Sequence, residues 1–316
     1  MAKFSIFSRA NKVVSKKITD FIYEYLSKAN NKSAPYKNKF RNLARHLTDF
    51  HERTGLPIEI DSFTESVASE FVEHLKSKNL MLPTVSSIFS NLVTSLRRAS
   101  NLGFHVVSGY ENINIKQEDS CAIYLTVAEL EKINAINNLS KEARACRDRF
   151  LVGCFTALRI SDYRAISVEE NFIGDFIHIK TRKTGEPVII PIHPIIRDIL
   201  SRNNNTIPKI PSQQAFGSTI KRVCKKAGIT ESVLWERTVG KKIVRKRIPK
   251  YRLVSSHTAR RSGATNMYLA GIPTARIMLL TGHKTESAFF KYIRIRKEEN
   301  AKILLEHDFF KKKSTH

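Results

Sequence analysis

Six polar residues in the second half of the chain could act together on a phosphate ester. Each has an ordinary explanation when taken singly, since surface arginines and lysines are usually solvated and a tyrosine on an amphipathic helix usually packs into a core. His257 and Arg260, however, lie three residues apart, where a helix places both on one face and lets them converge on a ligand. In chain order the six are Arg159, Lys183, His257, Arg260, His283 and Tyr292.

The residues around these six positions carry a family resemblance. Five short stretches resemble, in order, the arginine boxes, hairpin lysine and nucleophile helix of the tyrosine recombinases, also called phage-type integrases: Leu158-Arg-Ile-Ser-Asp162, Lys183-Thr-Gly, Ser256-His-Thr-Ala-Arg-Arg-Ser262, Leu280-Thr-Gly-His283 and Lys291-Tyr292. The resemblance covers about Tyr124 to Arg294, fills all six catalytic positions and is closest to integrases of integrative mobile elements. It implies a site-specific recombinase that cuts and rejoins DNA strands through a 3′-phosphotyrosyl intermediate.

The resemblance and the chemistry of each side chain together suggest roles. Phosphoryl transfer needs positive charge at the non-bridging oxygens, a positioned nucleophile and a proton for the leaving group. Arg159 and Arg260 are expected to clamp the phosphate in their planar forks. A protonated phenol is a poor nucleophile, so His257 is expected to be its base. Lys183 would protonate the departing 5′-oxygen, and His283 would donate to the phosphate and help to hold Tyr292.

Neither a metal ion nor a nucleotide cofactor is expected. Asp162 is expected to orient an arginine, and no acidic pair shows the spacing of a two-metal site. No glycine-rich phosphate loop ending in Lys-Ser or Lys-Thr occurs either. Because a phosphotyrosine bond retains the energy of the phosphodiester, rejoining needs no external energy source.

The catalytic residues are expected in a mixed α/β domain over residues 124–300. Thr126 and Glu129 form the pattern of a capping box at its start. Residues 233–254 are ambiguous, with a probable turn at 239–241 between two basic strands. The other predicted elements are a helix over Arg149–Ala157, a hairpin of Phe172–Lys180 and Val188–Ile192 with its turn at Gly185, a helix over Ser212–Ala227, and helices after His257 broken at 271–273 and 281–282.

The first third of the chain is predicted to be a separate helical domain. Apolar residues recur at three- and four-residue spacing in four stretches between Lys17 and Phe104, with a break at 55–57 and an N-cap for the third helix at Asp61 or Ser62. The predicted fold is therefore mainly α with a small β-hairpin or sheet, in two domains. The ranges are a basic tail 1–16, a helical core-binding (SAM-like) domain 17–104, a linker 105–123, the catalytic domain 124–300 and a C-terminal segment 301–316.

The charge balance points to nucleic acid. Fifty-four Lys and Arg stand against 29 Asp and Glu, a formal charge of +25 that a polyanion would neutralise. Fourteen of these cations and only two acids lie between Lys221 and Arg261. The alternative is a solvated basic loop. Expected DNA contacts are Lys241, Lys242, Arg245, Lys246, Arg247, Arg97 and Arg98, with Lys12, Lys16, Lys17, Lys37, Lys39, Arg41 and Arg45 as further phosphate-contact candidates.

The cysteines and the N-terminus indicate the compartment. The four cysteines include no CxxC pair, which argues against zinc and favours reduced, buried thiols. The N-terminus lacks the apolar core of a signal peptide, and no apolar run is long enough to span a membrane. A cytoplasmic protein is expected.

The expected partners follow from the resemblance. They are double-stranded DNA with specific recombination sites and further copies of the chain: a homotetramer on DNA, a monomer when free, with accessory DNA-bending proteins as a possible addition. The segment 301–310 could dock on a neighbouring subunit or fold back on its own domain. Two rival functions remain, a type IB topoisomerase and a non-catalytic DNA-binding protein on the same scaffold. The sequence names neither the target site nor the biological task, which could be integration, inversion or dimer resolution.

Overall fold

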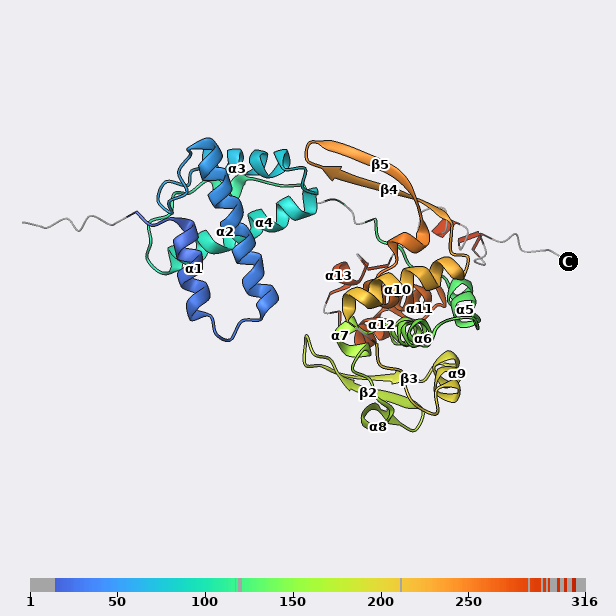
Figure 1. The fold of residues 1–316 in the computed structure, drawn as a ribbon. Coiled ribbons are helices and arrows are strands. Elements are labelled where there is room, and N and C mark those ends of the chain that lie inside the picture. Colours follow the sequence, from blue (N-terminus) through green and yellow to red (C-terminus); the bar gives the residue numbers. More distant parts are fainter. Residues whose placement is uncertain are drawn as a thin grey trace, which may run out of the picture. The chain divides into compact units, whose positions relative to one another are not determined.

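The structure is a computed structural model, and its described part is mainly helical, with two small antiparallel sheets. The described residues are 15–116, 118, 121–210, 212–283, 285–290, 292–293, 295, 300–301, 304–305 and 309–310. They fall into two compact units (Figure 1): the described residues of 1–120 with Trp235–Lys246, and those of 121–234 with 247–316. The predicted fold class is confirmed. Among the described helices, none combines the length and the apolar character needed to cross a membrane.

The first unit is built from four helices, as the apolar spacing predicts. They are α1 (Ile18–Lys28), α2 (Ala34–Thr54), α3 (Glu65–Ser77) and α4 (Leu82–Asn101), followed by a short 3-10 helix η1 (Tyr110–Asn112). Their apolar faces meet in one core, in which Leu43, Phe71 and Leu92 are fully buried. Gly55 ends α2 in the left-handed conformation, at φ 70°, which a residue with a side chain adopts at a cost.

The start of the third helix differs from the prediction. The N-cap is Thr64, whose hydroxyl accepts a hydrogen bond from Val67 N, and neither Asp61 nor Ser62 caps the helix. Ile60 and Phe63 are both buried, so the chain first turns these two side chains into the core and begins the helix only after them. Packing therefore overrides the local capping preference.

The ambiguous basic stretch forms a β-hairpin of β4 (Ser232–Val239) and β5 (Lys242–Pro249), with its turn at Gly240. Its tip belongs to the first unit. Gly240 N donates to Leu80 O at 2.9 Å, and a Cβ at this position would lie 2.8 Å from Lys76 O. The turn therefore needs glycine for its backbone conformation and for close approach to the chain after α3.

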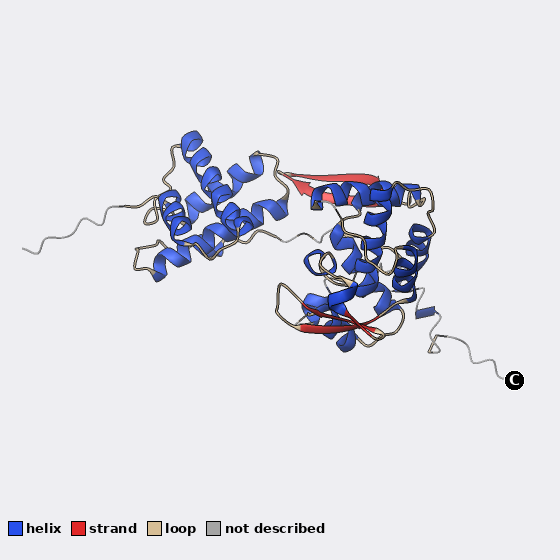
Figure 2. Ribbon diagram, turned by 60° about the horizontal axis from the view of Figure 1, so that its bottom comes forward, coloured by secondary structure: helices blue, strands red, loops and turns tan. Residues whose placement is uncertain are grey.

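The second unit surrounds one buried helix with further helices and a three-stranded sheet (Figure 2). The antiparallel sheet has the order β1-β2-β3. The elements are α5 (Val127–Asn134), α6 (Lys141–Thr156), α7 (Ile160–Tyr163), α8 (Val168–Asn171), β1 (Phe172–Ile173), β2 (Phe176–Lys180), β3 (Pro187–Pro191), α9 (Pro194–Arg202), α10 (Gln213–Lys226), the 3-10 helix η2 (Lys250–Leu253), α11 (Ser256–Leu269), α12 (Thr274–Thr281) and α13 (Glu286–Phe290).

The local signals at the start of this unit and in its last helices are confirmed. Thr126 and Glu129 form the reciprocal capping box of α5. Helix α11 ends just before Gly271, and α12 ends at Gly282 in the left-handed conformation, at φ 65°. The start of α11 and the end of α12 both lie at the candidate site.

Helix α6 is the centre of the second unit, and α11 packs directly against it. A Cβ at Gly263 would overlap Cys154 O and lie 2.9 Å from the Cβ of Ala157, so only glycine allows this approach. Arg149 is buried in α6 and donates hydrogen bonds of 2.8–3.0 Å to the carbonyls of Tyr163, Ile166, Ile207 and Pro208. This one guanidinium ties the segment after α7 and the loop before α10 to α6.

Candidate active site

The start of helix α11 presents His257 and Arg260 one turn apart, as their spacing predicts. The helix begins after Ser255, whose backbone N–H donates to Thr258 Oγ1 at 2.9 Å and so gains the partner that a helix end otherwise lacks. His257 is exposed, whereas Arg260 is only 1% exposed. The same helix turn therefore supplies one accessible imidazole and one buried cation.

Arg260 joins the ends of two other helices to α11. Its Nη1 donates to Ala157 O at 3.0 Å, and its Nη2 donates to Thr281 O at 2.5 Å. The Nη2 atom also lies 3.4 Å from His283 Nε2. Burial, and next the positive charge of Arg159, lower the pKa of Arg260 to about 10. The guanidinium thus remains a cation at neutral pH.

Arg159 follows a sharp turn at the end of α6. Ala157 has φ 53°, the left-handed conformation, and this turn ends α6 at Thr156, one residue before the predicted end of the helix at Ala157. Arg159 then becomes the N-cap residue of α7. Its Nη1 and the Nε of Arg260 are buried, and neither finds an acceptor among the described residues. Buried donors of this kind call for a further acceptor such as an anion.

Lys183 lies in the tight loop that joins β2 to β3. Gly185 N donates to Thr181 O at 2.8 Å, with Gly185 at φ 72°, which confirms the predicted turn. Lys183 itself is exposed. The backbone N–H of Arg182 donates to Asp162 Oδ1 at 3.0 Å, and Asp162 is only 1% exposed. Asp162 is predicted to orient an arginine side chain; its hydrogen bond instead anchors the backbone of the loop next to Lys183.

Tyr292 lies among the imidazoles and guanidiniums of the site. Its hydroxyl is hydrogen-bonded to His257 Nε2. Its ring centre lies 5.2 Å from that of His257 and 5.1 Å from that of His283. The guanidinium carbons of Arg260 and Arg261 lie 5.4 and 5.5 Å from the same ring centre. The phenol therefore has a basic nitrogen at its oxygen and two cations at its ring.

Both imidazoles are neutral at physiological pH. Loss of hydration, and next the positive charges of Arg261 and Arg260, lower the pKa of His257 to about 4, although the residue as a whole is exposed. Loss of hydration, and next Arg260 and Arg159, lower the pKa of His283 to about 4 as well. His283 Nδ1 is hydrogen-bonded to Thr281 Oγ1 at 2.8 Å, which fixes the ring orientation. A neutral imidazole can accept a proton, so His257 has the form that a base needs.

The structure brings together the predicted site residues from five places in the second unit: the start of α7, the β2–β3 loop, α11, and the segments that follow α12 and α13. Hydrogen bonds and ring contacts connect His257, Arg260, His283 and Tyr292, and the charges of Arg159 and Lys183 act on the pKa of His257. The sequence analysis missed Arg261. Nothing in the sequence marks it, because neighbouring helix residues normally point in directions about 100° apart.

The predicted DNA contacts lie mainly on the first unit and on the hairpin. Arg98 stacks on the Tyr25 ring at 3.8 Å, while Arg97 is exposed. Lys241 pairs with Glu73 at 2.7 Å, and Arg245 pairs with Glu236. The others on the hairpin are exposed: Lys242, Lys246 and Arg247. Lys12 and most of the C-terminal segment lie outside the described residues.

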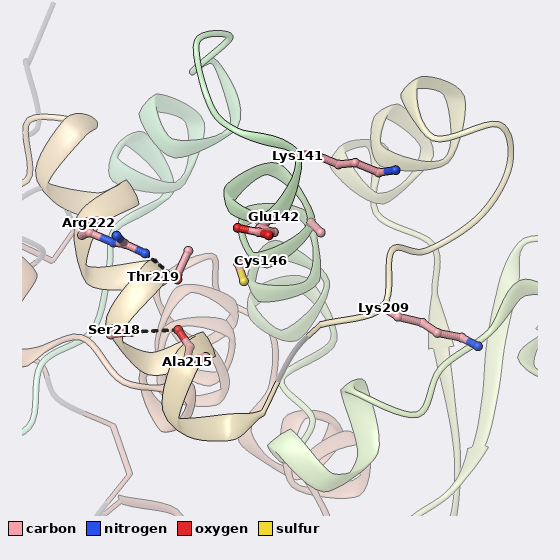
Figure 3. A pocket seen from close by; sticks show the side chains of 9 residues that line it. Lys141, Glu142, Cys146, Lys209, Ala215, Ser218, Thr219 and Arg222 are labelled. Carbon is pink, nitrogen blue, oxygen red and sulfur yellow. Dashed lines mark hydrogen bonds between the residues drawn. The ribbon is translucent and has the colours of Figure 1, made fainter.

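A separate hollow of about 710 Å³ lies beside α6 and α10 (Figure 3). Arg222 Nη2 donates to Thr219 Oγ1 at 3.0 Å at its edge. Lys141 and Lys209 extend away from Cys146 in the middle of the view. Burial raises the pKa of the Cys146 thiol to about 11, so this cysteine is not a thiolate. Among the described residues that line the hollow, the two lysines therefore do not converge and Cys146 is not an activated nucleophile.

Metal ligands do not gather in the part of the chain that the structure describes. No group of three or more His, Cys, Asp or Glu side chains is placed there to hold a metal ion. Cys146, Cys154 and Cys224 are buried free thiols, and Cys121 is half-buried.

Two family models match the chain. The model described as "Phage integrase family" matches residues 124–299, and the one described as "Phage integrase SAM-like domain" matches residues 17–116. The first covers more than half of the chain, including all six predicted catalytic residues. Comparison with curated proteins gives no match.

Several solved structures share the fold. A lambda integrase tetramer bound to a Holliday junction has a TM-score of 0.64 at 16% identity, covering 90% of this chain and 83% of that one. The Tn1549 transposon integrase in complex with a circular intermediate DNA has a TM-score of 0.65 at 15% identity, covering 92% and 99%. The XerH site-specific recombinase bound to a palindromic difH substrate, in a post-cleavage complex, has a TM-score of 0.65 at 16% identity, covering 91% and 84%.

Proposed function

Since the chain belongs to the phage integrase family of site-specific tyrosine recombinases, we propose that it cuts and rejoins DNA through a covalent bond between Tyr292 and a 3′-phosphate. The observation that carries this proposal is the hydrogen bond between the Tyr292 hydroxyl and His257 Nε2, beside two guanidiniums. A phenol whose oxygen faces a neutral imidazole can lose its proton as it attacks, and nearby cations stabilise the resulting charge.

Arg159 and Arg260 bind the scissile phosphate in this proposal. Each keeps a buried N–H without an acceptor among the described residues, and each stays charged at neutral pH as an arginine. A phosphate oxygen would accept from both, which removes the cost of the unpaired donors and offsets the repulsion between the two cations. The site is thus built for an anion and is electrostatically unfavourable without one.

The atoms of the cleavage step balance without an added reagent. The Tyr292 oxygen forms a bond to phosphorus and its proton passes to His257. The bond from phosphorus to the 5′-oxygen breaks, and Lys183 supplies the proton that the departing oxygen needs. With its proton on Nε2 and Thr281 Oγ1 donating to its Nδ1, His283 donates a hydrogen bond to a non-bridging oxygen, which requires Arg260 Nη2 to turn from Nε2 to the phosphate. Rejoining is the reverse sequence with a new 5′-hydroxyl, and because bond energy is conserved, the proposal needs neither metal nor ATP.

Asp162 places the proton donor of this scheme. Its buried carboxylate holds the backbone of Arg182 at 3.0 Å, directly before Lys183. Lys183 is then carried by a short anchored loop and still has an exposed, long side chain that can reach a bound strand. This arrangement combines a fixed backbone with an adjustable ammonium group, as a donor to a departing oxygen requires.

We also propose that duplex DNA with defined recombination sites is the substrate and that the chain acts on it as a homotetramer. The formal charge of +25 supports a polyanionic partner. Arg97, Arg98 and the hairpin residues Lys241, Lys242, Arg245, Lys246 and Arg247 are the proposed backbone contacts. Lys241 is paired with Glu73 and Arg245 with Glu236 in the free protein. On DNA, each cation would leave its glutamate and bind a phosphate instead.

The test compares two supercoiled plasmids, one carrying the DNA that flanks the gene and one of unrelated sequence. Purified protein should cut and recombine only the first. Equal relaxation of both plasmids would identify a topoisomerase, and tight binding of the first without cleavage would identify a DNA-binding protein. Tyr292→Phe should cut neither plasmid. Tyr268→Phe is its matched control, because Tyr268 is another tyrosine of the same unit, on α11, packed against Phe290.

A further inference from the structure

Arg261 is the cation of the site that the family pattern does not explain. It directly follows Arg260 on α11, and residues next to each other on a helix point in different directions. Yet the guanidinium carbons of both lie at nearly equal distances from the Tyr292 ring centre, 5.4 and 5.5 Å. The Tyr292 ring therefore contacts the guanidiniums of two neighbouring arginines.

Arg261 also contacts the segment that begins the second unit. Its Nη1 donates to Ile123 O at 3.3 Å. Two more residues of α11 bind the same segment: Leu125 N donates to Ser262 Oγ at 2.9 Å, and Asn266 Nδ2 donates to Leu125 O at 3.0 Å. Three side chains of α11 are thus hydrogen-bonded to the segment 123–125. Arg261 alone of these residues also contacts Tyr292.

We propose that Arg261 is a positioning residue for strand cleavage, which holds the Tyr292 phenol against His257. This inference rests on the proposed role of Tyr292. A cation near an aromatic ring is attracted to its electron-rich face, and the attraction grows as the phenol loses its proton. Arg261 therefore favours the reacting orientation without contacting the phosphate.

The same cation affects the base. The charged groups that face His257 are Arg260 and Arg261 on α11, Arg159 at the start of α7 and Lys183 in the β2–β3 loop, with the phenol of Tyr292 as its hydrogen-bond partner. Of these charges Arg261 does most to lower the pKa of His257. Removal of Arg261 should therefore raise the His257 pKa toward its ordinary value, and a larger share of His257 would be protonated near pH 6.

The test uses the full-length protein and a nicked DNA substrate carrying a site from the flank of its gene, on which the covalent product accumulates. Three variants are compared with the wild type: Arg261→Gln, Arg261→Lys and Asn266→Ala. The last removes a hydrogen bond to the same 123–125 segment but does not touch Tyr292. Adduct formation is measured in single turnovers from pH 5.5 to 8.5, together with DNA affinity at fixed salt.

Arg261→Gln should slow adduct formation about tenfold at pH 8, the scale of one partly desolvated cation–aromatic contact, and should slow it further at pH 6. Its DNA affinity should change by about threefold or less. Arg261→Lys should recover most of the rate, and Asn266→Ala should match the wild type at each pH. Circular dichroism at pH 6 and pH 8 gives the folded fraction of each variant, and each rate is corrected for it before the ratio is taken.

Two results would overturn the role of Arg261. One is a wild-type rate and pH ratio for Arg261→Gln. The other is an equal loss in Asn266→Ala, which would show that the hydrogen bonds to segment 123–125 are what matters. If the wild type cleaves but forms no adduct on Tyr292, the proposed function fails and the inference fails with it.

Discussion

The replacement of Arg260 by alanine separates the two tasks that the structure gives to this side chain. Arg260 donates to Ala157 O and Thr281 O while only 1% exposed, so it holds the ends of α6 and α12 against α11. It is also a proposed phosphate ligand. Arg260→Ala should therefore lower the free energy of unfolding as well as the rate of cleavage.

The change in the free energy of unfolding caused by Arg260→Ala follows from two opposing effects. Each lost hydrogen bond from a charged donor is worth about 1.5–3 kcal/mol, or about 3–6 kcal/mol for the two. Against this, the lowering of the Arg260 pKa to about 10 corresponds to about 3 kcal/mol of unfavourable burial and repulsion, which the variant escapes. The net loss of stability should be about 1.5 kcal/mol, a decrease in Tm of about 3–6 °C for a unit of this size.

Thermal unfolding followed by circular dichroism measures the first effect, and adduct formation on a nicked substrate measures the second. Cleavage should fall by more than 100-fold even at temperatures where the variant is fully folded, since a charged transition-state contact contributes several kcal/mol. Arg252→Ala is the control, because Arg252 is an exposed arginine of the same unit. A Tm within 1 °C of the wild type would refute the structural role, and a cleavage rate within threefold at full folding would refute the phosphate role.

Three further predictions use other observables. Recombination should continue in excess EDTA without nucleotide, because cations and imidazoles surround the proposed phosphate position; complete loss that Mg²⁺ restores would contradict this mechanism. Joint replacement of Lys241, Lys242, Arg245 and Arg247 by alanine should weaken DNA binding and flatten its salt dependence by up to about four charges' worth, whereas an unchanged slope would mean that the hairpin does not contact DNA. His257 and His283 should titrate near pH 4 by NMR in the free protein, so the unfolded state binds more protons between about pH 4 and 6.5 and stability should rise with pH across that window. Midpoints near 6.5 would show that neither loss of hydration nor the neighbouring charges shift the pKa of these rings.

The parts of the fold that local chemistry determines were predictable. The capping box at Thr126 and Glu129, the turn at Gly185 and the helix end at Gly282 each depend on residues a few positions apart, and each is confirmed. The predicted N-cap of α3 was wrong because the start of this helix depends on the burial of Ile60 and Phe63, a tertiary effect.

The candidate site was predictable as a set of residues but not as a geometry. Motif spacing marks His257 and Arg260, and family resemblance adds the other four. The left-handed turn at Ala157, which ends α6 before Arg159, is not encoded by a glycine and follows from packing against α11. The carbonyl partners of Arg149 lie 14–59 residues away along the chain, so no local pattern indicates them. Arg261 was missed for the same reason, since its partners Ile123 and Tyr292 are distant in sequence.

The identity of the nucleophile is the central claim, and mass spectrometry of the covalent product tests it most directly. On a nicked substrate whose short 5′-hydroxyl fragment diffuses away, the wild type should accumulate a protein–DNA adduct with the nucleotide on the peptide that contains Tyr292. Tyr292→Phe should form no adduct yet bind the site within about threefold of the wild type, because one hydroxyl contributes about 1 kcal/mol or less to a neutral contact. Tyr268→Phe should cleave normally. An adduct on Tyr251, on Tyr268 or on a serine, or cleavage that persists in Tyr292→Phe, would contradict the account.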